Sequence, residues 1–287
     1  PNSNQPIAMN TFHNPAELHA WCAAEKRLGR AIGLVPTMGC LHQGHLSLIR
    51  LAKERCDRVV VSVFVNPTQF APNEDYDAYP RREQDDLALC QAEGADAVFL
   101  PRPADLYAQD HSAWVEETLL AKTLEGAQRP THFRGVCTVV AKLFNIVQPD
   151  LAVFGQKDFQ QVAVIRRMVR DLNFPIEILR APIVRDADGL ALSSRNAYLT
   201  PENRASALCL SRAVRQAQDA VAAGQRDAAA IQADADRTLR DAGWIPDYAI
   251  VVDAETLMPI PTVLPGASAL LLAARKDGLR LIDNTLL

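Results

Sequence analysis

The chain has 287 residues, and its 48% hydrophobic content is enough to fill the cores of about two domains of ordinary size. Its formal net charge of -4 excludes the basic balance expected of a phosphate-backbone binder, so we expect no nucleic-acid partner. Its apolar runs are shorter than the ~18 residues of a membrane span, and its 6 cysteines form no Cys-x-x-Cys pair. These features favour a cytoplasmic protein with reduced thiols and no membrane association.

The first elements follow a short polar segment. Residues 1–8 precede Met9, a plausible natural initiator, and are interpreted as a remnant of cloning. Asn14 followed by Pro15 and then Glu17 forms a helix start, which predicts a helix to about residue 29. The apolar stretch 31–35 then predicts a strand that ends at Pro36.

The same alternation of strand and helix continues to about residue 182. Helices are predicted over residues 45–55, 80–93, 133–147 and 158–172, and strands over 58–65, 95–100, 151–154 and 176–179. The strands are apolar throughout, which is typical of a parallel sheet covered on both faces. Residues 1–182 are therefore predicted to form an α/β, Rossmann-like domain.

The pattern changes after residue 182. Residues 184–192 resemble a hairpin, and Thr200-Pro-Glu opens a long helix that is followed by another over 227–242. Strands are predicted over 248–252, 269–274 and 279–282, with a tight turn at Asp277-Gly278 between the last two. Residues 183–287 should form a smaller α+β domain, which could act as a lid.

Two histidines stand where the first domain should bind its ligand. His42 and His45 lie three residues apart, just after the first apolar strand, with Gly44 between them. At a helix start their imidazoles could share one face, beside unpaired backbone N-H groups that attract phosphate. A chance surface pair, or half a metal site, is the alternative, although no third ligand is adjacent.

Three further polar residues follow other parts of this domain. Asn66 and Gln69 end the second apolar strand and offer amide groups suited to a hydroxy acid; an ordinary Asn-Pro turn is the alternative. Arg129 could pair with an anion or belong to an exposed basic loop. Asp85 and Asp86, early in a helix, are interpreted as surface charges.

Two motifs could contact a polyphosphate. Lys157 follows the strand at 151–154 as a point charge, with Asp158 capping the next helix. Leu192-Ser193-Ser194-Arg195-Asn196 places two hydroxyl groups and a guanidinium after the hairpin. A solvated Lys-Asp pair and a polar turn are the respective alternatives.

Five motifs in order resemble the pantothenate synthetase family, whose members join pantoate to β-alanine within the His-x-Gly-His nucleotidyltransferase superfamily. They are residues 36–45 (PTMGCLHQGH), 65–70 (VNPTQF), 129–133 (RPTHF), 155–161 (GQKDFQQ) and 193–196 (SSRN). Leu192 and Cys40 depart from the residues usual in the family, with little consequence beyond local packing.

The resemblance implies a site and a reaction. Implied ATP contacts are Met38, Gly39, Cys40, Leu41, His42, Gln43, Gly44, His45, Gly155, Gln156, Lys157, Asp158, Val184, Leu192, Ser193, Ser194 and Arg195. His45 would donate a proton, Gln69 and Gln161 would hold pantoate, and Asn66 and Arg129 would lie nearby. Catalysis would fall to His42, His45, Lys157 and Arg195, with Mg²⁺ accompanying ATP and metal ligands unassigned. The resemblance also implies a pantoyl adenylate intermediate and a homodimer.

Rival functions remain at this stage. Another nucleotidyltransferase of the superfamily would release a nucleotide diester instead of AMP and an amide. A synthetase acting on tRNA is disfavoured by the acidic charge. A nucleotide sensor without catalysis would bind ATP but show no turnover, and would not need Gln69 and Gln161.

Overall fold

The computed structural model describes residues 9–72, 74 and 76–287, so the interpretation of residues 1–8 lies outside the described part. The chain divides into two compact units. Unit 1 comprises Pro1–Gly155 and Val164–Ala181, and unit 2 comprises Gln156–Ala163 and Pro182–Leu287. The contacts of the short segment 156–163 therefore assign it to the same unit as the C-terminal part of the chain.

Unit 1 is built on a parallel sheet with the strand order β1-β4-β3-β2-β5-β6. The strands are β1 (Asn10–Phe12), β2 (Ile32–Thr37), β3 (Arg58–Val63), β4 (Ala97–Phe99), β5 (Leu151–Gly155) and β6 (Glu177–Ala181). Side chains on both faces of β3 and β4 are buried, which explains why these strands are apolar throughout. The predicted parallel sheet is confirmed, although β1, a short edge strand, was not predicted from the sequence.

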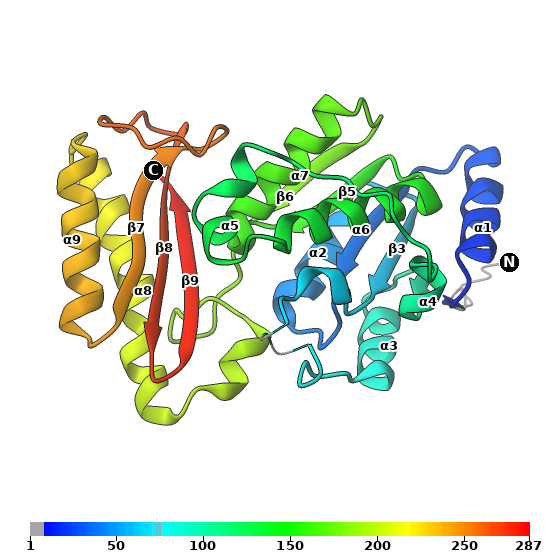
Figure 1. Ribbon diagram of the computed structural model, residues 1–287, viewed down its shortest axis with the longest axis horizontal. Coiled ribbons are helices and arrows are strands. Elements are labelled where there is room, and N and C mark those ends of the chain that lie inside the picture. The colour runs from blue at the N-terminus through cyan, green and yellow to red at the C-terminus, as the bar shows by residue number, and fades with distance from the viewer. Residues whose placement is uncertain (1–8, 73, 75) are drawn as a thin grey trace, which may run out of the picture. The chain divides into compact units, whose positions relative to one another are not determined.

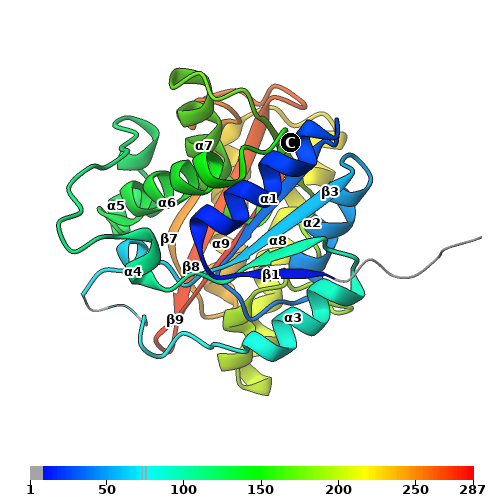
Figure 2. The ribbon, with the colours of Figure 1, turned by 90° about the vertical axis from the view of Figure 1, so that its right-hand side faces the viewer.

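Helices cover both faces of this sheet (Figure 2). The longer ones are α1 (Pro15–Arg27), α2 (Gln43–Lys53), α3 (Glu83–Ala92), α6 (His132–Val147) and α7 (Phe159–Asp171). The shorter ones are α4 (Pro103–Leu106), α5 (Glu125–Gln128), and the single turns η1 (Pro67–Gln69) and η2 (Leu120–Lys122). Helices α1 and α6 pack against each other, and α2 packs against α3. The predicted cap of α1 is confirmed, because the Asn14 side chain accepts from the Ala16 and Glu17 amides.

The prediction that the strand over residues 31–35 ends at Pro36 is wrong. Strand β2 runs to Thr37, and Pro36 pairs with Ser62 of β3. On its other side β2 pairs with β5 only at Gly33 and Leu34. Proline lacks an N-H donor, but this end of the strand has a single neighbour, so no ladder bond is lost.

Strand β2 is also where the winding of the sheet reverses. From β2 the chain adds β3 and β4 on one side, and then adds β5 and β6 on the other. Ligands of open α/β sheets bind beyond the carboxyl end of such a strand, at the topological switch point. The segment that leaves this end is the loop leading to His42 and His45.

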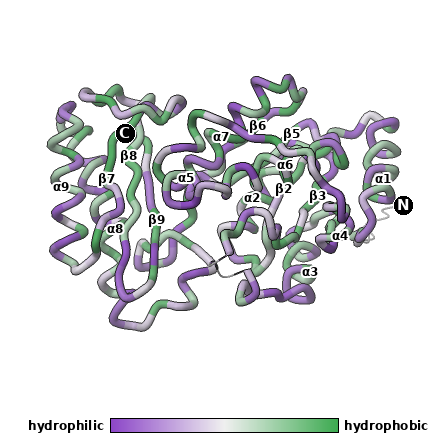
Figure 3. The backbone as a smooth tube through the Cα atoms, viewed as in Figure 1, coloured by the Kyte–Doolittle hydropathy of each residue, from purple (hydrophilic) through white to green (hydrophobic). Residues whose placement is uncertain are grey.

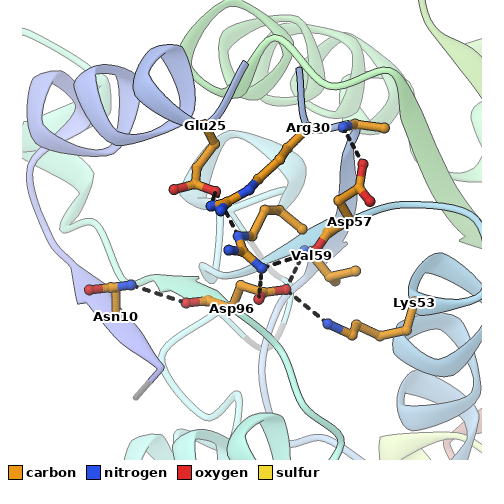
Figure 4. Close-up of polar contacts among 9 residues, drawn as sticks. Asn10, Glu25, Arg30, Lys53, Asp57, Val59 and Asp96 are labelled. Carbon is orange, nitrogen blue, oxygen red and sulfur yellow. Dashed lines mark hydrogen bonds and ion pairs between the residues drawn. The ribbon is translucent and has the colours of Figure 1, made fainter. Parts of the chain in front are cut away.

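Ion pairs occupy the opposite, amino end of the sheet (Figure 4). The Asp96 carboxylate accepts from the Val59 amide and pairs with Lys53 and Arg58. Arg58 also pairs with Glu25. Carboxylates therefore accept hydrogen bonds from strand-initiating N-H groups and pair with half-buried cations.

Unit 2 contains an antiparallel sheet of the order β7-β8-β9, with α8 and α9 packed against it (Figure 1). Its elements are η3 (Gln156–Asp158), η4 (Ser194–Tyr198), α8 (Pro201–Ala222), α9 (Ala228–Asp241), β7 (Ile245–Asp253), β8 (Ser268–Lys276) and β9 (Leu279–Leu286). Thr200 caps α8, and Asp277 and Gly278 take positive φ angles of 49° and 77° in the predicted turn. The predicted hairpin is present as one antiparallel bridge between Arg185 and Ala191.

The strands of the small sheet differ in hydropathy (Figure 3). Strand β8 is hydrophobic over most of its length, and its residues from Ser268 to Ala274 are buried. Strand β9 instead buries three consecutive polar side chains, Asp283, Asn284 and Thr285. Buried polar side chains need hydrogen-bond partners, so β9 must have polar neighbours.

Candidate active site

The loop after β2 is held by hydrogen bonds at its start. Thr37 Oγ1 donates to the Ser62 carbonyl at 2.8 Å and accepts from the Gly39 amide at 3.2 Å. Gly39 has φ +82°, and a Cβ there would lie 3.0 Å from Val63 Cγ1. Only glycine combines this backbone conformation with so close an approach.

Asp86 of α3 anchors the same loop, and its interpretation as a surface charge is wrong. Its side chain is 2% exposed, and it accepts from the amides of Cys40 at 2.9 Å and Leu41 at 2.7 Å. Burial raises the pKa of Asp86, against the lowering effect of these two amides. The missed signal is helical spacing, since Asp86 precedes buried Cys90 by four residues and shares its face.

His42 and His45 cap helix α2 reciprocally. His42 Nδ1 accepts from the Gly44 amide at 3.1 Å, and His45 Nδ1 accepts from the His42 amide at 3.3 Å. The ring centroids lie 4.1 Å apart. The two imidazoles therefore share one face of the helix start, as the sequence predicts.

This cap also fixes the tautomer of both rings. An Nδ1 atom that accepts a hydrogen bond carries no proton, so in the neutral ring the proton is on Nε2. In their neutral forms His42 and His45 therefore both carry the ring proton on Nε2. The donors lie at a helix N-terminus, where the dipole favours anions.

Several of the backbone N-H groups at this turn are engaged within the chain. The amides of Gly39, Cys40, Leu41, His42 and Gly44 all donate within the chain. These amides hold the loop and the imidazoles in place.

A second polar turn leaves the sheet beside the first, since Thr37 pairs with Val63 at the ends of β2 and β3. In this turn Asn66 is 1% exposed. Its Oδ1 accepts from the Tyr107 hydroxyl at 3.0 Å, and its Nδ2 donates to Gln69 Oε1 at 3.0 Å. Asn66 is thus saturated inside the protein, which corrects its assignment to substrate contact: it orients Gln69.

Two further bonds hold the backbone of Gln69, and another holds the turn in which it lies. The Asn66 Nδ2 also donates to the Gly135 carbonyl at 3.2 Å, which ties the turn to α6. Arg129 Nη2 and the His132 ring bond the Gln69 carbonyl at 3.2 Å and 3.0 Å. Because Gln69 Oε1 accepts from Asn66, the Nε2 donors of Gln69 do not point toward Asn66.

Arg129 does not present an open guanidinium. Its Nε and Nη2 donate to the two carboxylate oxygens of Glu74 at 2.6 Å and 2.7 Å. Burial raises the pKa of Glu74, but the bonds and charge of Arg129 outweigh it and leave the pKa below its ordinary value of 4.5. The anion that Arg129 was predicted to bind is thus a carboxylate of its own chain. No motif of the sequence marks Glu74 as this partner.

Unit 2 brings together two of the predicted motifs. The η3 turn contains Gln156, Lys157 and the exposed Asp158, and Gln161 follows it half-buried. The Leu192 amide donates to the Val184 carbonyl at 3.0 Å, and Ser193 Oγ accepts from the Arg195 amide at 3.3 Å. Residues of β9 contact the η3 turn and pair with Arg185 of the hairpin. Gly155, the last residue of β5, belongs to unit 1.

Within residues 9–72, 74 and 76–287, no group of three or more His, Cys, Asp or Glu side chains could hold a metal ion. Across the same residues, no helix is long and apolar enough to cross a membrane. The polar groups that the candidate site does contain are imidazole, carboxamide and cationic side chains.

A parallel sheet with a histidine-capped helix at its switch point defines an α/β enzyme with a nucleotidyltransferase-type fold. The chain matches the Pantoate-beta-alanine ligase family over residues 10–286. The chain therefore belongs to the pantoate-β-alanine ligase family and is a ligase. The resemblance found in the sequence is confirmed.

Similar proteins match along nearly their full length. The pantothenate synthetase of Moorella thermoacetica is 51% identical over 97% of this chain and 99% of the relative. A crystal structure of pantothenate synthetase from Thermus thermophilus has a TM-score of 0.91, with 45% identity, over 97% of this chain and 99% of that one. A Francisella tularensis pantoate-β-alanine ligase complexed with βγ-ATP and β-alanine has a TM-score of 0.81, with 34% identity, over 97% and 98%.

Proposed function

We propose that the chain condenses (R)-pantoate with β-alanine to give pantothenate, converting ATP to AMP and pyrophosphate through a pantoyl adenylate. The observation that carries the proposal is the reciprocal cap that places the imidazoles of His42 and His45 together at the N-terminus of α2, at the switch point of the sheet. Membership of the ligase family supports the reaction type. The Francisella relative was crystallised with the same two kinds of ligand, ATP and β-alanine.

In the first step, a pantoate carboxylate oxygen bonds to the α-phosphorus of ATP, and the bond to the bridging oxygen breaks. The electron pair leaves with pyrophosphate, so negative charge increases on the phosphate oxygens. His42 and His45 would donate Nε2-H bonds to these oxygens, with His45 supplying the proton to the leaving oxygen. Residues Met38–Leu41, Gln43 and Gly44 would shape this ATP site.

In the second step, the free amine of β-alanine attacks the acyl carbon of the adenylate. The acyl C–O bond breaks, AMP leaves with its electron pair, and the amine loses a proton as the amide forms. Gln69, oriented by Asn66, would donate from Nε2 to pantoate and border the amine site, and Gln161 would bind pantoate as well. Orientation by fixed side chains lowers the entropic part of the barrier.

Two cationic side chains would supply the positive charge. Lys157 and Arg195 would neutralise developing phosphate charge, and the hydroxyls of Ser193 and Ser194 would accept or donate hydrogen bonds. The other proposed ATP contacts are Gly155, Gln156, Asp158, Val184 and Leu192. Mg²⁺ would enter as the Mg-ATP substrate complex, held mainly by phosphate oxygens.

We also propose a homodimer in a reducing, cytoplasmic setting. The free state of Cys22, Cys40, Cys56, Cys90, Cys137 and Cys209 supports the reducing environment. The family resemblance implies the dimer. Analytical ultracentrifugation, which gives the mass of the protein in solution, tests it.

Following pyrophosphate and AMP separately tests the two-step reaction. With ATP, Mg²⁺ and pantoate alone, one equivalent of pyrophosphate per active site should appear, and AMP should follow only after β-alanine is added. Pantoate labelled with ¹⁸O in its carboxylate should pass one label to AMP. Formation of ADP, or label-free AMP, would contradict the adenylate route.

A further inference from the structure

The three polar residues of β9 have different partners. The Thr285 hydroxyl accepts from Gln218 Nε2 of α8 at 2.7 Å. Side chains of a strand alternate between its faces, so Asp283 shares the face of Thr285 and Asn284 points to the other. Asn284 thus faces away from α8, and its partners come from the η3 turn.

The carboxamide of Asn284 fastens this turn by its backbone. Its Nδ2 donates to the carbonyls of Gln156 at 3.0 Å and Lys157 at 2.9 Å. Its Oδ1 accepts from Gln156 Nε2 at 3.3 Å. Asn284 is 3% exposed, so water cannot replace these bonds easily.

An asparagine is well suited to this position. Two successive carbonyls of a tight turn point the same way, and a carboxamide provides two N-H groups from a single nitrogen. Aspartate has the same shape but would set a carboxylate against two carbonyl oxygens. One of these bonds is to the carbonyl of Lys157, so it fixes the backbone from which the lysine side chain extends.

The preceding residue, Asp283, fastens the second motif of unit 2. Its two carboxylate oxygens accept from Arg185 Nη1 at 2.7 Å and Nη2 at 2.8 Å. Arg185 Nη1 also donates to the Gly189 carbonyl at 3.2 Å, across the hairpin. Adjacent residues of β9 therefore fasten the segment of Lys157 and the hairpin that leads to Ser193.

We propose that Asn284 is a positioning residue that places Lys157 for its contact with ATP, with Asp283 doing the same for the hairpin of residues 184–192. The inference rests on the proposed function, because it requires that Lys157 acts on ATP. Residues that hold a functional group in place typically change affinity or activity by about 10- to 100-fold when they are removed.

The test measures ATP kinetics in Asn284→Ala, with Thr285→Val as the matched control. Both changes remove a buried polar side chain from β9, but Thr285 contacts α8 and not the turn. Asn284→Ala should lower kcat/KM for ATP by about 10- to 100-fold and leave the KM for β-alanine unchanged. Thr285→Val should keep wild-type kinetics. Equal effects of the two variants would overturn the proposal.

A double mutant separates positioning from general damage. If Asn284 acts through Lys157, Asn284→Ala should have little further effect on ATP kinetics when added to Lys157→Ala. Additive effects would overturn the inference while leaving the proposed function intact. Wild-type ATP kinetics in Lys157→Ala alone would instead refute the assignment of Lys157 to ATP, and the inference with it.

Hydrogen exchange gives a readout independent of activity. Peptides covering residues 156–158 should exchange faster in Asn284→Ala and unchanged in Thr285→Val. If Asn284→Ala does not fold, Asn284→Asp replaces it, since it keeps the Oδ1 acceptor and removes both donors. Unchanged exchange and ATP kinetics in a folded variant would overturn the inference.

Discussion

The two ends of the six-stranded sheet use polar groups in opposite ways. At the amino end, carboxylates of Asp57, Asp150 and Asp96 accept from the first amides of β2 and β3 or their neighbours, at 2.8 Å each. Asp96 and Asp150 also pair with lysines. At the carboxyl end, the β2 loop presents two imidazoles at a helix N-terminus.

The difference indicates which end binds a charged substrate. Charges at the amino end are matched within the chain, so a polyphosphate there would have to displace existing partners. The imidazole donors at the carboxyl end lie where the helix dipole favours phosphate. The comparison predicts that variants at the amino end reduce stability without affecting catalysis, and that variants of the β2 loop and its histidines at the carboxyl end reduce activity.

The largest effect is expected for His45→Ala. Loss of a donor to the developing phosphate charge should reduce pyrophosphate formation by about a hundredfold or more. Loss of the cap should cost about 1 kcal/mol of unfolding free energy. Single-turnover pyrophosphate release measures the loss of rate. The control is His19→Ala, which replaces an exposed histidine of α1. Near-normal release in His45→Ala would contradict the role of this end.

Gly39→Ala should produce the next largest effect, a loss of about 10- to 100-fold in kcat/KM. The new Cβ would lie 2.9 Å from Asp86 Oδ2, so the loop before the histidines must move. Gly94→Ala is the matched control, since Gly94 has a similar φ of +76° but nothing within 4 Å of the new Cβ. If both variants lose activity equally, backbone strain explains the loss and the loop geometry does not.

At the amino end, Asp96→Asn should change stability and not catalysis. It weakens the pairs with Lys53 and Arg58, which should cost about 2 kcal/mol of unfolding free energy. Urea unfolding measures this cost, and activity per folded molecule should stay at the wild-type value. Asp171→Asn, in an exposed pair with Arg170, should be neutral. A catalytic defect in Asp96→Asn would contradict the claim that polar groups at the amino end serve stability and not catalysis.

The smallest effect concerns the ion pair at the carboxyl end, between Glu74 and Arg129. The folded-state pKa of Glu74 lies below 4.5, so the pair stabilises the protein above that pH. Glu74→Gln should cost about 1 kcal/mol at neutral pH. The difference from wild type should vanish as the pH falls through the lowered pKa. A difference that does not depend on pH in urea unfolding would refute the ion-pair explanation.

Local signals allowed much of the fold to be predicted. Residues close together in the sequence determine the cap at Asn14 and the turn at Asp277-Gly278. The apolar runs of the strands are likewise visible in the sequence. Strand β1 was missed because three partly exposed residues carry almost no pattern. The length of β2 was misjudged because the tolerance for Pro36 depends on where β5 stops pairing.

The site was predictable only in part for a similar reason. Proximity at a helix start follows from the spacing of His42 and His45, but the reciprocal cap that fixes their tautomers requires coordinates. Partners far apart in sequence were not predicted, such as Asp86 for the β2 loop and Asn284 for the η3 turn. Hydrogen bonds that consume a donor are likewise invisible in a sequence, which explains the corrections at Asn66 and Arg129.

A crystal structure with Mg²⁺ and a non-hydrolysable ATP analogue tests most directly whether the two histidines bind the triphosphate. We expect phosphate oxygens within hydrogen-bond distance, about 2.7–3.2 Å, of Nε2 of both His42 and His45. An analogue bound at full occupancy elsewhere, with neither imidazole in contact with a phosphate, would contradict this central claim.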